Sequence, residues 1–218
     1  MTTEHREEGR PVSRGAEARL HQVSWLGLDA LRKERDEKSY RPKALDVRLR
    51  RERTKNEVRL LAEARRLGVR TPVVYDVDLA QYRIILEHLP GPTLKELLEQ
   101  SAGATEPVAA PMRAFGRALG RLHAGGISHG DLTSSNVLFP EGPTGHAALL
   151  DLSMGARNSS LEERGIDLHL VEEDLKGLHA QGEALYTGFL EGYEEGNPAG
   201  AKDVRQRARE IKGRIRYA

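Results

Sequence analysis

The most informative segment of the chain runs from His129 to Asn136 and reads His-Gly-Asp-Leu-Thr-Ser-Ser-Asn. A second stretch, Ala148–Asp151, follows after a short spacer and reads Ala-Leu-Leu-Asp. Apolar residues flank both stretches, so we expect Asp131 and Asn136 on a loop and Asp151 at the end of a buried strand. An Asp, an Asn and a second Asp in this order suit the binding of ATP together with Mg²⁺.

In such a site each of the three polar residues has a separate task. Asp131 is expected to accept or orient the proton of the nucleophile, while Asn136 and Asp151 hold the metal that neutralises the phosphates. The same order occurs in the protein-kinase pattern. The alternative is a polar turn between two strands, since Asp, Asn and Ser are ordinary turn formers.

The composition excludes several classes of protein. The chain has 218 residues, enough for one good core or two small lobes, and 31% of them are charged. No run of about 18 apolar residues is present, so no membrane span is expected, and Met1–Arg10 lacks the apolar core of a secretory signal. Cysteine is absent, which excludes disulfides and thiolate sites. These features fit a cytoplasmic protein.

The formal net charge of +1 hides an uneven distribution of charged residues. Asp29–Arg70 carries 15 Lys and Arg against 8 Asp and Glu, and Ser160–Glu195 carries 10 acids against 2 bases. Residues 202–218 carry 7 bases against 2 acids. Such blocks indicate a polyanion or an acidic partner, or else solvated helix faces.

The N-terminal part of the chain predicts three strands after a disordered start at residues 1–11. Val12–Gly27 predicts two strands joined by a turn at Gly15, with Glu17 close by. A kinase has a glycine-rich loop over the phosphates at this place. This chain has only Gly15 there, and Gly15 and Glu17 are the candidates for that contact.

The third strand, Ala30–Arg35, ends close to two lysines. Lys33 is the expected phosphate-binding lysine, because Ala30 and Leu31 precede it in strand alternation. Lys38 is the alternative.

A long charged helix is predicted from Pro42 to Leu67, because proline is tolerated in a first turn and Gly68 can end the helix. Glu57 is the expected partner of Lys33, since it shares a helix face with the apolar pair at positions 60 and 61. Glu52 and Glu63 remain alternatives.

Two further strands, Thr71–Val77 and Tyr82–Leu86, lead to a predicted hinge at residues 87–91. Backbone groups of Glu87 and Leu89 are expected to bond the adenine edge. The rest of the chain predicts helices at 93–100, 112–124, 166–178 and 184–193, loops at 101–111 and 157–164, and a basic helix or tail at 202–218. His169 and His179 lack second and third ligands at metal spacing and are expected to be surface or core residues.

Taken together, these segments resemble the PRPK-like family, the small atypical kinase and ATPase subunit of the KEOPS complex and a relative of the RIO kinases. The resemblance covers nearly the whole chain from about residue 12. The catalytic loop is shared with other kinase-like folds, including aminoglycoside phosphotransferases. The segments that carry it are residues 15–18 (Gly-Ala-Glu-Ala), 33–35, 38–41, 45–46, 53–54 with 57, 68–69, 71–75, 129–136, 165–168 and 209–214.

The resemblance implies an α+β, minimal bilobal protein-kinase-like fold. Its β-rich N-lobe would span residues 12–89, its reduced helical C-lobe 90–201, and a basic tail 202–218. It also implies that Lys33 is the ATP lysine with Glu57 as its partner, that Asp131 is the catalytic acid/base, and that Asn136 and Asp151 bind Mg²⁺.

The partners that the resemblance implies are the KEOPS catalytic subunit, which installs threonylcarbamoyl on adenosine in tRNA, the small subunit that binds the kinase, and tRNA itself. ATP hydrolysis would support that modification, and protein-serine phosphorylation is also attributed to the family. The tail residues Lys212, Arg214 and Arg216 would face tRNA or a partner. The alternatives are a stand-alone phosphotransferase and a tRNA-binding scaffold with a relict site.

Two positions depart from the family pattern. Leu152-Ser153 follows Asp151 where Phe-Gly is usual, so Leu152 would have to supply the packing of the phenylalanine. The tail has Lys212-Gly213-Arg214 where Arg-Gly-Arg is common, which removes one bidentate phosphate contact.

Overall fold

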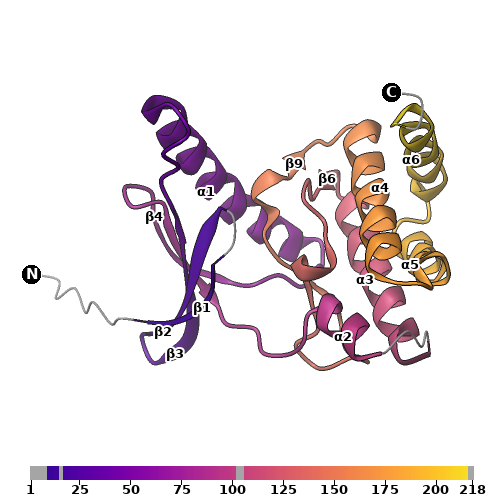
Figure 1. The fold of residues 1–218 in the computed structure, drawn as a ribbon, viewed down its shortest axis with the longest axis horizontal. Helices are drawn as coiled ribbons and strands as arrows, with labels where there is room; N and C mark the ends of the chain where they lie inside the picture. The colour runs from indigo at the N-terminus through magenta and orange to yellow at the C-terminus, as the bar shows by residue number, and fades with distance from the viewer. Residues whose placement is uncertain (1–8, 15–16, 102–105, 216–218) are drawn as a thin grey trace, which may run out of the picture.

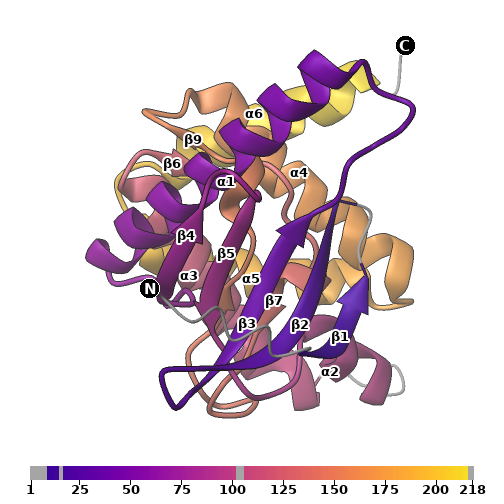
Figure 2. The same cartoon turned by 90° about the vertical axis from the view of Figure 1, so that its left-hand side faces the viewer.

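The computed structural model describes residues 9–14, 17–101 and 106–215. Figure 1 shows a sheet with one helix beside a group of helices. The sheet is antiparallel and has the strand order β1-β2-β3-β5-β4, and Figure 2 shows its strands side by side. Its strands are β1 (Arg10–Arg14), β2 (Ala18–Trp25), β3 (Leu28–Arg35), β4 (Val74–Asp78) and β5 (Arg83–Glu87).

Helix α1 (Lys43–Arg66) packs against this sheet, and Gly68 follows its end in the left-handed conformation that favours glycine. The predicted long helix is therefore confirmed. One face of α1 is buried and the opposite face is exposed, as expected for a helix that covers a sheet on one side only.

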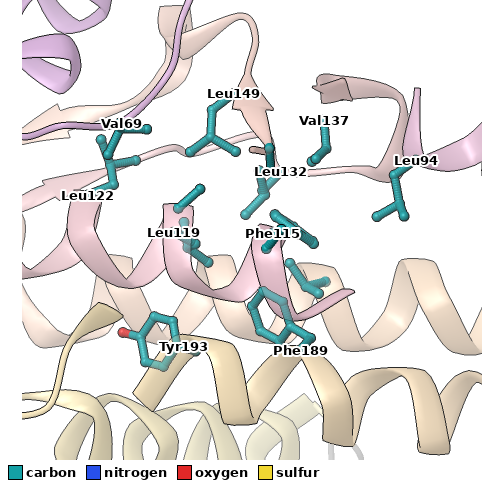
Figure 3. Close-up of a cluster of buried hydrophobic side chains, with 14 of the residues drawn as sticks. Val69, Leu94, Phe115, Leu119, Leu122, Leu132, Val137, Leu149, Phe189 and Tyr193 are labelled. Carbon is teal, nitrogen blue, oxygen red and sulfur yellow. The ribbon is translucent and has the colours of Figure 1, made fainter. Parts of the chain in front are cut away.

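The second half of the chain is mainly helical. Helices α3 and α5 pack closely together, and Figure 3 shows Phe115 and Leu119 of α3 beside Phe189 and Tyr193 of α5. The helices are α2 (Leu94–Gln100), α3 (Glu106–Ala124), α4 (Leu161–Leu178), α5 (Gly182–Gly196) and α6 (Ala201–Ile215). This organisation confirms the predicted α+β class.

Short strands and turns connect the two parts and carry the residues of the motif. Strand β6 (Ile127–Ser128) pairs with β9 (Ala156–Arg157), and β7 (Val137–Leu138) pairs with β8 (Ala148–Leu149). Two 3-10 turns, η1 (Ser134–Asn136) and η2 (Leu152–Met154), lie within this region.

Two predicted loops were wrong in part, because each contains the first turns of a helix. Helix α3 begins at Glu106 and not at 112, and the buried Val108 lies one turn before the buried Met112. Helix α4 begins at Leu161 and not at 166. Its start is a capping box, in which Ser160 and Glu163 bond each other's backbone N–H groups.

The predicted disorder of residues 1–11 was wrong for Arg10 and Pro11. Both belong to β1, where they pair with Gln22 and His21. Residues 1–8 lie outside the described residues, as do Gly15 with its predicted turn, residues 102–105 and residues 216–218.

The C-terminal basic segment, predicted as a helix or a tail, is a packed helix up to Ile215. Its apolar residues Val204, Ala208 and Ile211 are buried, and α6 lies against α4. This segment therefore extends the helical layer of the protein.

Glycine sets the close approach of α3 and α5, which gives a test of the packing. A Cβ on Gly192 would overlap the backbone of Arg113, so we expect Gly192→Ala to lower the free energy of unfolding by about 1 to 3 kcal/mol. A Cβ on Gly188, in the same helix, would meet only Met112 at 3.8 Å. Gly188→Ala should raise stability by up to about 1 kcal/mol through helix propensity. Urea unfolding checks both, and equal effects would contradict the packing.

Candidate active site

A cleft of about 570 Å³ lies where the sheet meets the helical part of the chain. Residues of β2, β3, α1 and β5 line one side of it, and the motif loop and the residues after β8 line the other. The predicted site residues among its lining are Glu17, Lys33, Glu57, Glu87, Asp131, Asn136 and Asp151. The fold thus brings together residues that are up to 134 positions apart in the sequence.

Glu57 of α1 and Lys33 of β3 form a buried ion pair at the back of this cleft. The Nζ of Lys33 donates to Oε1 of Glu57 at 2.7 Å, and the two residues are only 6% and 1% exposed. Arg35 donates to Oε2 of the same carboxylate. We did not predict Arg35, although strand alternation places positions 33 and 35 on one face.

The alternatives left open by the sequence lie elsewhere. Glu52 is near Arg48 on the exposed face of α1, at 3.9 Å, and Glu63 pairs with Arg157 at 2.9 Å. Lys38 follows the strand, and its backbone N–H bonds Asp46. The geometry therefore pairs Lys33 with Glu57.

Asp151, on the other side of the cleft, forms a second ion pair with Lys33. Its Oδ2 lies 2.9 Å from Nζ of Lys33, and Oδ1 accepts from the N–H of Ser153 at 3.4 Å. Burial alone would raise the pKa of Asp151, but the ammonium of Lys33 holds this pKa well below its ordinary value. The carboxylate is therefore ionised at neutral pH.

The backbone of Asp151 is in the left-handed region, with φ 53° and ψ 67°. This conformation is uncommon for a residue with a Cβ, and such strain often occurs at functional sites. Leu152, which replaces the usual phenylalanine, is fully buried. Asn56 of α1 donates to the carbonyls of Ser153 and Gly155, at 3.1 and 2.8 Å, and so fixes this segment to the sheet-side helix.

The catalytic-type loop holds its two polar residues by a local hydrogen bond. Nδ2 of Asn136 donates to the backbone oxygen of Asp131 at 2.8 Å, and the backbone oxygen of Asn136 accepts from Leu150 at 2.9 Å. These bonds leave the side-chain amide oxygen of Asn136 available to coordinate a metal ion. Asp131 is exposed at the cleft.

A buried carboxylate supports this loop from behind. Asp167 of α4 accepts from the N–H groups of His129 and Gly130, at 2.6 and 2.8 Å, and lies 3.1 Å from Nε2 of His123. The other ring nitrogen of His123 lies 2.8 Å from the hydroxyl of Tyr193. The sequence predicts Asp167 only as a residue near the start of a helix, within a matching segment, because nothing local shows that it reaches the loop.

The ionisation of Asp167 and His123 depends on their burial and on their hydrogen bonds. Burial would raise the pKa of Asp167, but its hydrogen bonds with His123 and with the backbone lower it. Burial also lowers the pKa of His123, which keeps the imidazole neutral. The loop therefore rests on an anionic acceptor at neutral pH.

Glycine is required directly before Asp131. Gly130 has a φ of 83°, and a Cβ there would overlap the carbonyl of Met154. The backbone can therefore turn toward the cleft only at a residue without a side chain.

Glu17 binds two arginines at the edge of the cleft. It accepts from Arg41 at 2.8 Å and lies 2.6 Å from the guanidinium of Arg53 on α1. Partial burial would raise the pKa of Glu17, but Arg41 and Arg53 together outweigh this effect and lower the pKa. Glu17 thus links the start of β2 to α1.

The predicted hinge residues differ in position. The carboxylate of Glu87 is bound by both terminal nitrogens of Arg70, at 2.6 and 3.1 Å, and its backbone is next to the cleft. Leu89 is buried and is not among the residues that line the cleft.

The basic C-terminal residues lie away from the cleft and are paired with acids of α4. Lys212 is 2.5 Å from Glu172, and Arg214 donates to Glu162 at 2.8 Å. Arg216 lies outside the described residues.

The prediction that His169 has no ligand-type neighbours was wrong. Its ring lies with Glu172 and Glu173 in a group whose potential ligand atoms are within 4.8 Å of one another. Helical spacing brings these side chains together on α4. Glu172, however, already binds Lys176 and Lys212.

Comparisons with known proteins support a kinase-like fold. Residues 6–187 match the family model described as lipopolysaccharide kinase (Kdo/WaaP) family. A solved structure of WaaP in complex with acyl carrier protein aligns with a TM-score of 0.58 and 19% identity, over 94% of this chain and 88% of that chain. The fold is therefore that of a minimal, bilobal kinase-like protein, as predicted.

The more similar relatives narrow this class. The KEOPS complex subunit Bud32 of Pyrococcus abyssi is 36% identical over 215 residues, which cover 94% of this chain and 95% of that protein. The chain belongs to the family of the KEOPS complex subunit Bud32, so the predicted family is confirmed.

Other relatives are longer proteins. A protein of Methanosarcina mazei named as a bifunctional tRNA threonylcarbamoyladenosine biosynthesis protein is 38% identical over 211 residues, and one of Methanoculleus marisnigri is 40% identical over 206 residues. The chain spans 36% of the length of each. Within the part of the chain that the structure describes, no helix is long and apolar enough to cross a membrane.

The support by Asp167 can be tested through stability. Asp167→Asn removes a charged, fully buried acceptor from the N–H groups of His129 and Gly130, so we expect the free energy of unfolding to fall by about 2 to 3 kcal/mol at pH 7. Asp131→Asn, at an exposed position, should change it by less than about 0.5 kcal/mol. Denaturant unfolding measures both.

The same measurement has a defined pH dependence. Because the folded-state pKa of Asp167 is lowered, its stabilisation is present above about pH 4, the ordinary aspartate value, and is lost as the pH falls through the lowered pKa. The stability gap between wild type and Asp167→Asn should therefore narrow on acidification. A constant gap would show that the carboxylate does not act through its charge.

Proposed function

We propose that this protein is an Mg²⁺- and ATP-dependent phosphotransferase, an atypical serine/threonine kinase and ATPase. We further propose that it works in a KEOPS complex that supports threonylcarbamoyladenosine modification of tRNA. The observation that carries the proposal is the convergence of Lys33, Asp131, Asn136 and Asp151 on one cleft. The family membership supports the assignment to the complex.

ATP fits this cleft by the chemistry of its lining. Apolar side chains of Ala18, Leu20, Leu31, Leu86 and Leu150 line one part of it, which suits a flat adenine ring. The backbone groups of Glu87, which lines the cleft, and of Leu89, two residues further along the chain, are the proposed partners of the adenine edge.

Lys33 is the cation for the phosphates. Glu57 and Asp151 hold its ammonium at the inner end of the cleft, 2.7 and 2.9 Å from their oxygens. A fixed lysine stabilises the charge that shifts between phosphate oxygens during transfer. Glu17 lines the cleft and pairs there with Arg53, and we propose it as a further contact near the phosphates.

The donor atoms at Asn136 and Asp151 fit magnesium. Asp151 is ionised and Asn136 keeps its amide oxygen free, and Mg²⁺ prefers such oxygen ligands. When bound, the ion would neutralise phosphate charge.

Asp131 is the residue that meets the nucleophile. We propose that its exposed carboxylate takes the proton of a water, or of a serine hydroxyl, as the oxygen forms a bond to the γ-phosphorus of ATP. The bond between that phosphorus and the bridging oxygen breaks, and ADP leaves. Water as nucleophile gives ATP hydrolysis, and serine gives protein phosphorylation.

The partners follow from the family. We propose the KEOPS catalytic subunit, the small subunit that binds the kinase, and tRNA as the molecules that this protein meets in the cytoplasm. Lys212, Arg214 and Arg216 remain proposed contacts to tRNA or a partner.

The role of Asp131 predicts a large loss of activity without loss of fold. We expect Asp131→Ala to lower Mg²⁺-dependent ATP turnover about a hundredfold or more, because the general base is removed. Phosphate release by the purified chain, alone and with the KEOPS catalytic subunit and tRNA, measures the effect. Retained turnover would assign the proton transfer to another group.

The two candidate lysines provide a matched pair. Lys33→Ala should lower turnover about a hundredfold, because a positioned donor to the phosphates is lost. Lys38→Ala should leave turnover within about twofold, since this residue lies outside the cleft lining. Circular dichroism confirms the fold of each variant, and a reversed order of effects would overturn the assignment of the phosphate lysine.

A further inference from the structure

The outer face of α1 carries a row of cations. Positions 48, 51, 55, 59 and 66 lie within one side of the helix at its period of about 3.6 residues. All five residues are exposed. We call this set the basic stripe, and its members are Arg48, Arg51, Lys55, Arg59 and Arg66.

The charges of the basic stripe are largely uncompensated. Among residues 9–14, 17–101 and 106–215, no carboxylate lies within ion-pair distance of Arg51, Lys55, Arg59 or Arg66. Arg48 has one distant partner, Glu52, at 3.9 Å. These side chains therefore keep their positive charge available to a ligand.

The C-terminal basic helix is the opposite case. Arg205 pairs with Glu194, and Arg207 and Arg214 both pair with Glu162. Lys212 pairs with Glu172. Although both segments are basic in sequence, most described cations of α6 are neutralised within the fold, and those of the basic stripe are not.

The basic stripe ends beside a hollow of about 590 Å³ lined by four arginines: Arg65, Arg70, Arg117 and Arg121. Arg65 donates to the carbonyl of Thr71 at 2.6 Å, and Arg121 to the carbonyl of Gly68 at 3.4 Å. Neutral carbonyls leave the charges of Arg65 and Arg121 uncompensated, whereas Arg70 pairs with Glu87 and Arg117 with Glu195. Figure 1 shows the C-terminal end of α1 reaching the helical part of the protein. Residues of α1 and α3 line the hollow.

We infer that the basic stripe and the adjoining arginine hollow bind the phosphodiester backbone of an RNA. From residue 48 to 66 the stripe extends about 27 Å at about 1.5 Å per residue, a length that spans several phosphates of one strand. Arginine binds phosphate oxygens through its planar fork of donors. This inference rests on the proposed function and extends it, because it places the tRNA substrate on this surface.

The chemistry of the face favours RNA over a protein partner. The exposed positions of α1 from 48 onward are six cations, Glu52 and Ala62, with no large apolar side chain among them. The centre of a protein interface is usually depleted in charge and enriched in aromatic residues. Phosphate contacts need only the cations.

The test removes three charges from the middle of the basic stripe in the full-length chain. The variant Arg51→Gln, Lys55→Gln and Arg59→Gln keeps good helix formers at exposed positions. Affinity for a tRNA transcript is measured by fluorescence anisotropy over a range of salt concentrations. We expect affinity at low salt to fall about tenfold or more and the slope of log K against log salt to become shallower by about 2 to 3.

A control variant lowers the net charge by the same amount, but at positions outside the basic stripe. Arg19→Gln, Lys95→Gln and Lys202→Gln remove three exposed cations of β2, α2 and α6. This control should retain the affinity and the salt slope of the wild type. Equal losses in both variants would reduce the effect to net charge and overturn the inference.

ATP turnover in the same preparations separates this inference from the proposed function on which it rests. Turnover in wild type and variant, with RNA affinity lost only in the stripe variant, supports both. Unchanged RNA affinity in a variant that hydrolyses ATP overturns the RNA surface alone. Unchanged RNA affinity with loss of binding to the catalytic subunit would make this face a protein interface. Absence of turnover in the wild type would count against the proposed function only.

Discussion

The carboxylate of Glu57 is the interaction on which the rest of the site depends. It is almost completely buried, and a buried charge is tolerated only when it is paired and hydrogen-bonded. Lys33 and Arg35 supply that pairing from β3, so α1 is fixed to the sheet at this point. Because Lys33 also contacts Asp151, the same interaction joins the sheet to the helical part of the chain. The ion pairs of Lys33 with Glu57 and with Asp151 thus hold the two walls of the cleft together.

Asp167 has the corresponding function for the loop on the other wall. Loops have few internal hydrogen bonds, and a site on a loop needs support from neighbouring elements. The Asp167 carboxylate supplies this support by accepting from two consecutive backbone N–H groups, directly before Asp131. The left-handed backbone at Gly130 and at Asp151 then directs the chain at the cleft. Two buried carboxylates, each from a helix, therefore fix residues that are themselves in irregular structure.

The two basic segments of the chain, on α1 and on α6, differ in whether their charges are neutralised, and composition does not show this difference. Two basic segments have similar sequence character, but α6 packs on the acidic α4 and its cations find carboxylates there. The outer face of α1 has no acidic element against it within the described residues. Burial of one helix face leaves the other face free, and this asymmetry sets which cations a polyanion can reach.

From the sequence alone we could predict the α+β class, the family, most element positions and most of the site residues, although Leu89 does not line the cleft. These follow from local signals: the alternation that turns Lys33 inward, the spacing of Asp131 and Asn136, and the apolar strand before Asp151. Only the tertiary structure decided that Glu57 and not Glu52 or Glu63 pairs with Lys33, that Arg35 shares this carboxylate, and that Asp167 supports the loop 37 positions away. It also decided which basic residues are neutralised. The physical reason is that periodicity fixes which side of an element a residue occupies, whereas a partner distant in sequence is chosen by the packing of whole elements.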